Sequence, residues 1–391
     1  MKESSRTYSL LTSDDRAMGW LVNRRVKPIL ILLSFLLSLL LLFFVVVRLV
    51  GEQTLLHHAA QISPYSMIFA REIHVRDADK AFERLIFFFG DSSVVTVKGS
   101  TATQREIRIP GMLEKVMNQR YPEIGGVSVV EWAFIGAQPF DYYCMLFGVE
   151  KYSPSLVIAP INWRTLGGED ESPKSRFPGL SRMVPPAERF SLSRDNPLVL
   201  EDISLAHQAL YVFDKPRLYA QGLKLWSRAA LSTLLHPETL EANTTPIETI
   251  PPNVRNWQER MARWSDSALF GKYPLEITAE KTQMRILHLI AKTASARGIQ
   301  FLFYITPIHT YEIKTRETFD AEKLQRSVQT ILEQTTVGST ECVNLIDLLE
   351  TSDDFVDYHE HYNVEGNRKI AEALAAAARE TLLKTGARSA P

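Results

Sequence analysis

The chain has 391 residues, enough for two or three domains or for one enlarged α/β domain. Its 44 Lys and Arg residues nearly balance 45 Asp and Glu residues, so no overall basic field is available to hold nucleic acid. At 45% hydrophobic residues the chain can bury a large core, and its only two cysteines, Cys144 and Cys342, exclude a disulfide-rich scaffold and a zinc site built on cysteine clusters.

The first element is an uncharged apolar run at 28–47. At about 1.5 Å rise per residue it spans the roughly 30 Å hydrocarbon core of a bilayer, which predicts a transmembrane helix at 28–48. A cleaved signal peptide is the alternative, but the apolar region of a signal peptide is usually only about 7 to 15 residues long. We therefore expect the helix to anchor the chain in a lipid bilayer.

Basic residues lie before this apolar run, and the positive-inside rule keeps such residues in the cytoplasm. They are Lys2, Arg6, Arg16, Arg24, Arg25 and Lys27. We expect a cytoplasmic tail at 1–27, a linker and docking segment at 49–82, and an extracytoplasmic (periplasmic) domain on the inner membrane. Phosphate-binding and dinucleotide-binding glycine patterns are absent, and we expect no cofactor and no metal. Whether the two cysteines pair in an oxidising compartment stays open.

Short apolar runs then alternate with helical patterns. The runs predict strands at 85–89, 127–134, 156–159, 301–306 and, more weakly, 343–346. The helical patterns lie at 111–120, 140–147, 278–297, 321–334 and 365–384. This alternation predicts an α/β domain at 83–391 with a parallel sheet of about five strands and helices on both faces.

A stretch at 164–279 carries no clear buried strand and interrupts the alternation. It is an insertion that either shapes a substrate cleft or packs as a loop-rich subdomain. Its tryptophans at 226, 257 and 264 are candidates for stacking on sugar rings, although large aromatic residues are more often part of a core.

The first predicted strand ends in Gly90-Asp91-Ser92, which places a serine hydroxyl at the carboxyl end of a parallel strand. Ligand crevices of open α/β sheets lie at that edge. Serine becomes a nucleophile when a base takes its proton and donors stabilise the oxyanion. Without a base, Gly-Asp-Ser is an ordinary turn.

A second polar segment, at 357–367, opens the last helical pattern and contains His359 and His361. An imidazole near its reference pKa accepts a serine proton at neutral pH, and a carboxylate such as Asp357 fixes its tautomer. The alternative is that Asn363 caps the helix and that the histidines are surface residues.

Together the two segments resemble the SGNH, or GDSL-type, serine hydrolase family over residues 83–163 and 298–384. The resemblance implies a flavodoxin-like sheet (the SGNH fold) and a nucleophilic Ser92. It also implies three oxyanion donors: the Ser92 N–H, the N–H of Gly136 after the second strand and the side chain of Asn162 after the third.

The resemblance further implies that His361 is the catalytic base, because His361, Asn363 and Gly366 match the family's His-x-Asn-x-x-Gly pattern. Two departures stand out. The usual Gly-x-Asn-Asp segment is Pro-Ile-Asn-Trp here, so Trp163 replaces the acid.

The second departure is that the residue three before His361 is Tyr358 rather than an aspartate. Asp357 reaches the histidine only if the loop accommodates one extra residue, and we favour it as the partner. Asp354 and a Ser-His dyad are the alternatives, and His359 is the rival base. Asp91, Trp163 and, after the fourth strand, His309 are candidate substrate-binding residues.

The resemblance points to membrane-anchored relatives that move acetyl-like groups on cell-envelope polysaccharides or glycolipids. We expect a serine esterase or O-acyltransferase, with an acylated carbohydrate or other ester as substrate and a membrane O-acyltransferase as a candidate partner. The alternative is a catalytically inactive SGNH-fold protein that binds or assembles exopolysaccharide. A lipase acting at the bilayer is a weaker third interpretation.

Overall fold

The structure is a computed structural model in which the described residues are 11–51, 54–55, 84–95, 106–134, 136–167, 180–185, 187–188, 219–228, 230–231 and 257–386. Most of the predicted linker at 49–82, the first ten residues and much of the predicted insertion lie outside these ranges.

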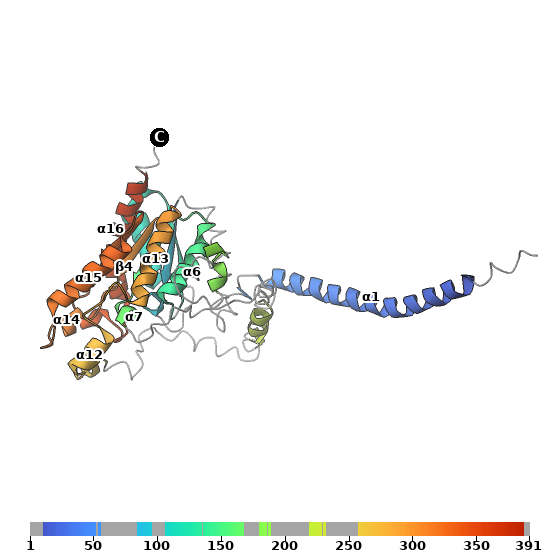
Figure 1. Ribbon diagram of the computed structural model, residues 1–391, viewed down its shortest axis with the longest axis horizontal. Coiled ribbons are helices and arrows are strands. Elements are labelled where there is room, and N and C mark those ends of the chain that lie inside the picture. Colours follow the sequence, from blue (N-terminus) through green and yellow to red (C-terminus); the bar gives the residue numbers. More distant parts are fainter. Residues whose placement is uncertain are drawn as a thin grey trace, which may run out of the picture.

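The N-terminal helix α1 (Leu11–Val50) projects away from the rest of the chain (Figure 1). Its segment Pro28–Val50 has a mean hydropathy of 3.2, and none of the apolar window within it is buried in the protein. The predicted apolar helix is therefore confirmed as a helix, and it is long and apolar enough to cross a membrane. It extends further towards the N-terminus than the predicted span.

The sheet has five parallel strands in the order β2-β1-β3-β4-β5, which confirms the predicted architecture. This is the flavodoxin-like order of doubly wound sheets. The strands are β1 (Arg84–Gly90), β2 (Val127–Ala133), β3 (Leu156–Ile161), β4 (Phe301–Ile305) and β5 (Thr340–Asn344).

Strand β5 begins three residues before the predicted run, at Thr340. Thr340 and Glu341 pair with the first residues of β4 although they are polar. An edge strand has only one neighbour and is partly exposed, so it tolerates polar residues that a search for apolar runs misses.

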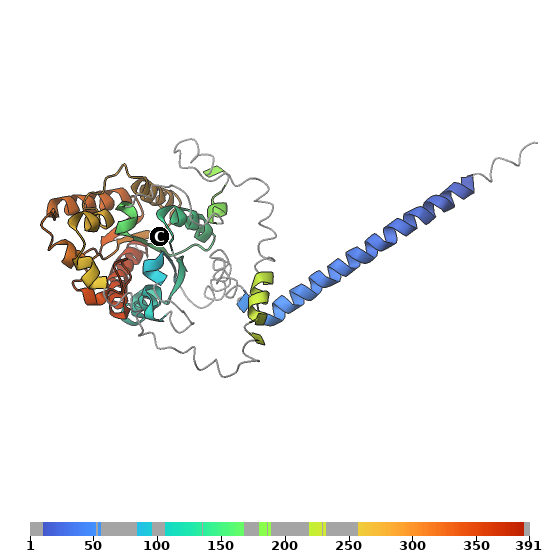
Figure 2. The same ribbon diagram turned by 90° about the horizontal axis from the view of Figure 1, so that it is seen from below.

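Helices cover both faces of the sheet (Figure 2). Helix α5 (Ile109–Arg120) packs against α16 (Val364–Gly386), and α13 (Thr282–Ala296) packs against both α6 (Pro139–Glu150) and α15 (Ala321–Thr335). The shorter elements are α4 (Ser92–Val95), η2 (Pro122–Ile124), α7 (Trp163–Gly167), η3 (Leu180–Met183), α11 (Trp257–Ala262), α12 (Asp266–Lys272), α14 (Thr310–Ile313) and η4 (Ser352–Asp354).

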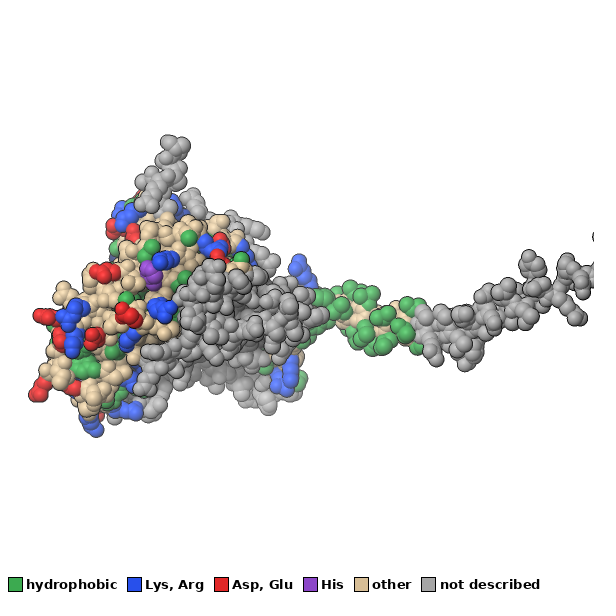
Figure 3. Space-filling model, in the orientation of Figure 1, with side chains coloured by type: hydrophobic (Ala, Val, Ile, Leu, Met, Phe, Trp, Pro, Cys, Tyr) green, Lys and Arg blue, Asp and Glu red, His purple; other side chains and the backbone are tan. Residues whose placement is uncertain are grey.

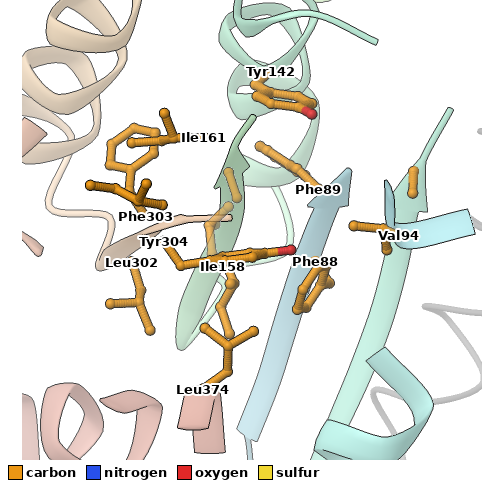
Figure 4. Close-up of a cluster of buried hydrophobic side chains, with 14 of the residues drawn as sticks. Phe88, Phe89, Val94, Tyr142, Ile158, Ile161, Leu302, Phe303, Tyr304 and Leu374 are labelled. Atoms are coloured by element: carbon orange, nitrogen blue, oxygen red, sulfur yellow. The ribbon is translucent and has the colours of Figure 1, made fainter. Parts of the chain in front are cut away.

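The central strand β1 is apolar on both faces, as a strand between two helical layers must be. Phe88 and Phe89 point to opposite sides of the sheet (Figure 4). Phe88 lies 6.1 Å from Tyr304 between ring centroids, and Phe89 stacks on Tyr142 of α6 at 6.2 Å. Burying one such side chain contributes about 1.5 to 3 kcal/mol, which holds the end of β1 in a fixed position.

The chain leaves β1 towards β2 on one side, and β3 pairs with β1 on the other side. This change of direction creates the crevice where open α/β sheets bind ligands. A Cβ on Gly90, the last residue of β1, would lie 2.6 Å from the Val94 side chain. Glycine is therefore required for α4 to fold back over the end of the strand.

The described parts of the predicted insertion form helices and irregular segments without a strand. They belong to two different places. Helices α11 and α12 pack on the main core through buried Trp257 and Leu269, and Trp264 is partly buried there. A helix described at 219–228 and 230–231 packs instead against α1.

Candidate active site

In the loop after β1, Ser92 is partly exposed, whereas Ser93 is held by hydrogen bonds to Asp91. The Asp91 carboxylate accepts hydrogen bonds from the Ser93 N–H at 2.8 Å and from the Ser93 hydroxyl at 2.6 Å. Asp91 and Ser93 are buried, whereas Ser92 is partly exposed. Burial raises the pKa of Asp91 above its ordinary value, although the Ser93 hydrogen bonds oppose that rise. Of the two adjacent serines, Ser92 is thus the one available to a substrate.

The loop before α16 contains a histidine–carboxylate pair. His361 Nδ1 lies 2.7 Å from Asp357 Oδ2, and Asp357 Oδ1 accepts the His359 N–H at 2.7 Å. Burial alone would raise the pKa of Asp357, but the hydrogen bond and charge of His361 outweigh it and hold that pKa below its ordinary value. A proton on Nδ1 donates to the carboxylate and leaves Nε2 as an acceptor.

The extra residue between Asp357 and His361 is absorbed at Glu360, whose φ of 63° is in the left-handed region. Asp354, the other predicted partner, is buried and binds Lys369 Nζ at 2.8 and 2.9 Å through its two oxygens. In the structure the residue paired with His361 is therefore Asp357.

Both loops lie at the carboxyl edge of the sheet, because the first directly follows β1 and Glu360 of the second accepts a hydrogen bond from Thr306, directly after β4. His361 is close enough to Asp91 for its charge to act on the pKa of Asp91. His361 Nε2 is buried and has no hydrogen-bond partner among the described residues, so no bond to the Ser92 hydroxyl is formed here. Hydrogen bonds between catalytic groups are often long in ligand-free enzymes and tighten when substrate binds.

Besides the Ser92 N–H, the two other predicted oxyanion donors follow strands that border β1. Gly136 comes after β2 and has a φ of 83°, a conformation that favours glycine. Asn162 comes directly after β3, and its Oδ1 accepts the Arg164 N–H at 3.1 Å. This bond turns Nδ2 towards Asp91, with a long contact of 3.4 Å to Oδ2. The amide donor of Asn162 therefore faces the serine loop.

Asn363 caps helix α16, which is the role that the alternative interpretation of the sequence gave it. Its Oδ1 accepts the Gly366 N–H at 2.8 Å, and its Nδ2 donates to the Asp353 carbonyl. A Cβ on Gly366 would lie 2.5 Å from the Asp354 carbonyl oxygen. The Asn363 and Gly366 positions of the pattern therefore fix the start of α16, directly after the loop that contains His361.

His359, the rival base, is engaged by a residue that the sequence analysis did not identify. Arg164 Nη1 contacts His359 Nδ1. Burial and then the Arg164 charge lower the pKa of His359 to about 4. His359 is thus neutral at neutral pH, and one of its ring nitrogens is already occupied.

Glu360 is a second residue that the sequence analysis did not identify. It is completely buried, and Thr306, directly after β4, donates to its Oε2 at 3.1 Å. Burial raises the pKa of Glu360 to about 8, although the Arg164 charge opposes that rise. A carboxyl between two histidines was the available signal, but its burial depends on the tertiary structure.

Two predicted substrate-binding residues are buried among protein side chains. The His309 ring packs against Phe355 with 4.0 Å between ring centroids, and burial lowers the pKa of His309 to about 3. Trp163 is fully buried and its indole donates to the Pro274 carbonyl at 2.9 Å. Asp91 lines a small pocket with Tyr142 and Asn162, large enough for about one water molecule.

No protein-family model matches the chain, and no curated protein matches it. No group of three or more His, Cys, Asp or Glu residues that could hold a metal ion occurs within the described ranges. Cys144 lies in α6 and Cys342 in β5, and no disulfide joins them.

Proposed function

We propose that this protein is a membrane-anchored, extracytoplasmic serine esterase or O-acyltransferase that acts on short acyl esters. The observation that carries the proposal is the buried His361 Nε2, which has no hydrogen-bond partner among the described residues while Nδ1 is held by Asp357. Leaving such an acceptor unsatisfied costs about 1 to 3 kcal/mol. A serine or substrate proton would satisfy it, and Asp91, next to Ser92, is close enough to His361 to be influenced by its charge.

The reaction follows from these positions. Ser92 Oγ attacks the acyl carbon and its proton passes to His361 Nε2. The Asn162 amide and the Gly136 and Ser92 N–H groups stabilise the oxyanion. The ester C–O bond then breaks, and the leaving oxygen takes the proton from His361. Water or a sugar hydroxyl next attacks the acyl-serine, with His361 again as base, which gives an esterase or a transferase respectively.

The membrane anchor of the proposal is α1, with the basic N-terminal residues in the cytoplasm. The α/β domain predicted at 83–391, called the sheet domain below, then lies in the periplasm. Cell-envelope polysaccharides or glycolipids are the proposed acyl carriers there. The pocket beside Asp91 holds only about one water molecule, so it leaves no room for a long acyl chain at that position. A membrane O-acyltransferase that delivers activated acyl groups is the proposed partner.

A second candidate is a catalytically inactive SGNH-fold protein that binds or assembles exopolysaccharide. The observation that favours it is the missing hydrogen bond between Ser92 and His361 among the described residues. The two candidates differ in whether an ester is turned over.

The test uses the full chain in nanodiscs and a fluorophosphonate probe, which reacts with activated serines. We expect labelling at Ser92, loss of labelling in Ser92→Ala, and retention in the matched variant Ser93→Ala. Hydrolysis of p-nitrophenyl acetate should require both Ser92 and His361. Full labelling of Ser92→Ala would reject the assignment, and glycan binding without any turnover would favour the assembly protein.

A further inference from the structure

The helix at 219–228 and 230–231, named here the insertion helix, packs on the C-terminal end of α1 (Figures 1 and 2, yellow-green). Tyr219 of the insertion helix, Val47 of α1 and Leu55 form a buried cluster separate from the main core. Leu223 and Trp226 pack against this cluster. A segment about 170 residues downstream of α1 therefore contacts the last turns of the apolar helix.

The contact is close between backbones. A Cβ on Gly222 would lie 2.0 Å from the Leu55 carbonyl oxygen. No side chain larger than hydrogen fits at this position without moving one of the two segments. Gly222 therefore allows the insertion helix to reach the end of α1.

The level of this contact in a bilayer follows from the length of the apolar segment. Pro28–Val50 is 23 residues, or about 34 Å at 1.5 Å per residue, slightly more than the roughly 30 Å hydrocarbon core. Most side chains of this apolar segment are exposed and hydrophobic (Figure 3). Phe43 and Val50 of the contact belong to its final turns, so the contact lies at the boundary between acyl chains and headgroups.

We propose that the insertion helix lies in the headgroup region of the bilayer that α1 spans, held there by its packing on α1. It therefore forms a second contact of the protein with the membrane, in addition to α1. This inference rests on the proposed anchoring by α1 and not on the proposed chemistry.

The composition of the insertion helix fits a position in the headgroup region. Trp226, which is partly buried, is of a residue type enriched at membrane interfaces. Lys224 and Arg228 are exposed and match the anionic surface of lipid headgroups, with stems long enough to follow the apolar boundary. Leu231 is 56% exposed, which is unfavourable in water and favourable against acyl chains.

The test measures the depth of a fluorophore in the membrane. The full chain carrying Leu231→Cys is labelled with NBD and reconstituted into phosphatidylethanolamine–phosphatidylglycerol vesicles that contain headgroup-level spin-labelled lipid. The matched control is Glu322→Cys on α15, an exposed position of the sheet domain. The parent chain gives the background, which is small because Cys144 is buried and burial raises the pKa of the Cys342 thiol to about 12.

We expect a blue-shifted emission and loss of most fluorescence at position 231, with little loss at position 322. Equal quenching at the two positions would overturn the inference, as would protection of position 231 by a second copy of the chain or by added glycan. A mature chain that begins after residue 50 would overturn both the anchoring and the inference while leaving ester turnover testable.

A second pair of variants tests the packing on α1 in the Leu231→Cys background. Gly222→Ala should reduce the quenching, because the added methyl group displaces the insertion helix from Leu55. Gly271→Ala is the matched control, since a Cβ at that position on α12 meets nothing within 4 Å. Unchanged quenching in Gly222→Ala would overturn the role of α1. Ser92→Ala should show the parent's quenching, which separates this inference from the proposed chemistry.

Discussion

The two loops of the candidate site are built in different ways. The loop after β1 is organised by its own residues, since Asp91 accepts both hydrogen bonds from Ser93 two positions later. The loop before α16 depends on distant segments. Tyr273 donates to the Tyr358 carbonyl at 2.5 Å, Arg164 contacts His359, and Thr306 donates to Glu360.

This difference shows where each half of the site is encoded. A three-residue turn at the end of the buried strand β1 positions the serine mainly through hydrogen bonds within the turn. The histidine is positioned only when β3, β4 and the end of the insertion have folded around its loop. Substitutions around the loop before α16 should therefore distinguish residues that affect turnover from residues that affect only stability. They provide the sharpest tests.

The largest expected effect is on turnover in Asp357→Asn. An amide cannot hold the His361 tautomer or stabilise its charged form, so turnover of p-nitrophenyl acetate should fall by about 10⁴-fold. Stopped-flow or steady-state kinetics on the folded variant measures this loss.

The matched control is Asp354→Asn, three residues earlier. Its carboxylate binds Lys369 and not His361, so we expect near-parental turnover and a loss of about 1 to 3 kcal/mol in unfolding free energy. If Asp354→Asn were the inactive variant and Asp357→Asn the active one, the pairing in the structure would be irrelevant to catalysis.

A smaller effect is expected for Asn162→Ala, which removes a donor that faces the serine loop. Loss of one oxyanion donor costs about 10² to 10³ in kcat. The KM should change little, because the donor acts on charge that develops in the transition state. A change confined to KM would show that Asn162 binds the ground state instead.

The smallest effect concerns stability and pH, through Glu360. Its pKa of about 8 in the folded protein lies above the ordinary value of 4.5, so the folded state holds a proton that the unfolded chain loses. Stability therefore falls as pH rises towards 8. Below about pH 6.5 the buried His309 and His359, whose pKa values are lowered, act in the opposite direction, so the loss of stability due to Glu360 is clearest above that pH.

Between pH 6.5 and 8 the parent should lose about 2 kcal/mol of unfolding free energy from this group. Glu360→Gln carries no titrating proton and should show a flatter profile in urea unfolding at the two pH values. A variant that keeps the parent's slope would assign the pH dependence to another group.

Much of the fold could be predicted from the sequence. Four of the five strands were apolar runs, and the amphipathic helices had clear periodicity, because buried strands and helix faces must be apolar. The fifth strand was displaced, since Thr340 is buried but polar and carries no apolar signal. The two locations of the insertion could not be predicted, because Tyr219 and Trp257 look alike in sequence although one packs on α1 and the other on the main core.

The sequence by itself determined the apolar helix, the alternation of strands and helices, and the turn after β1 that contains Ser92. These features depend on residues close together in the chain, where periodicity and local hydrogen bonds act directly. The tertiary structure decided that Asp357 pairs with His361, that Arg164 occupies His359, and that Glu360 is buried. Asp357 and His361 are only four residues apart, but Tyr273 from a distant segment holds the loop between them. The contacts of Arg164 with His359 and of Thr306 with Glu360 also join distant segments, and the burial and charge that such contacts create have no local signature.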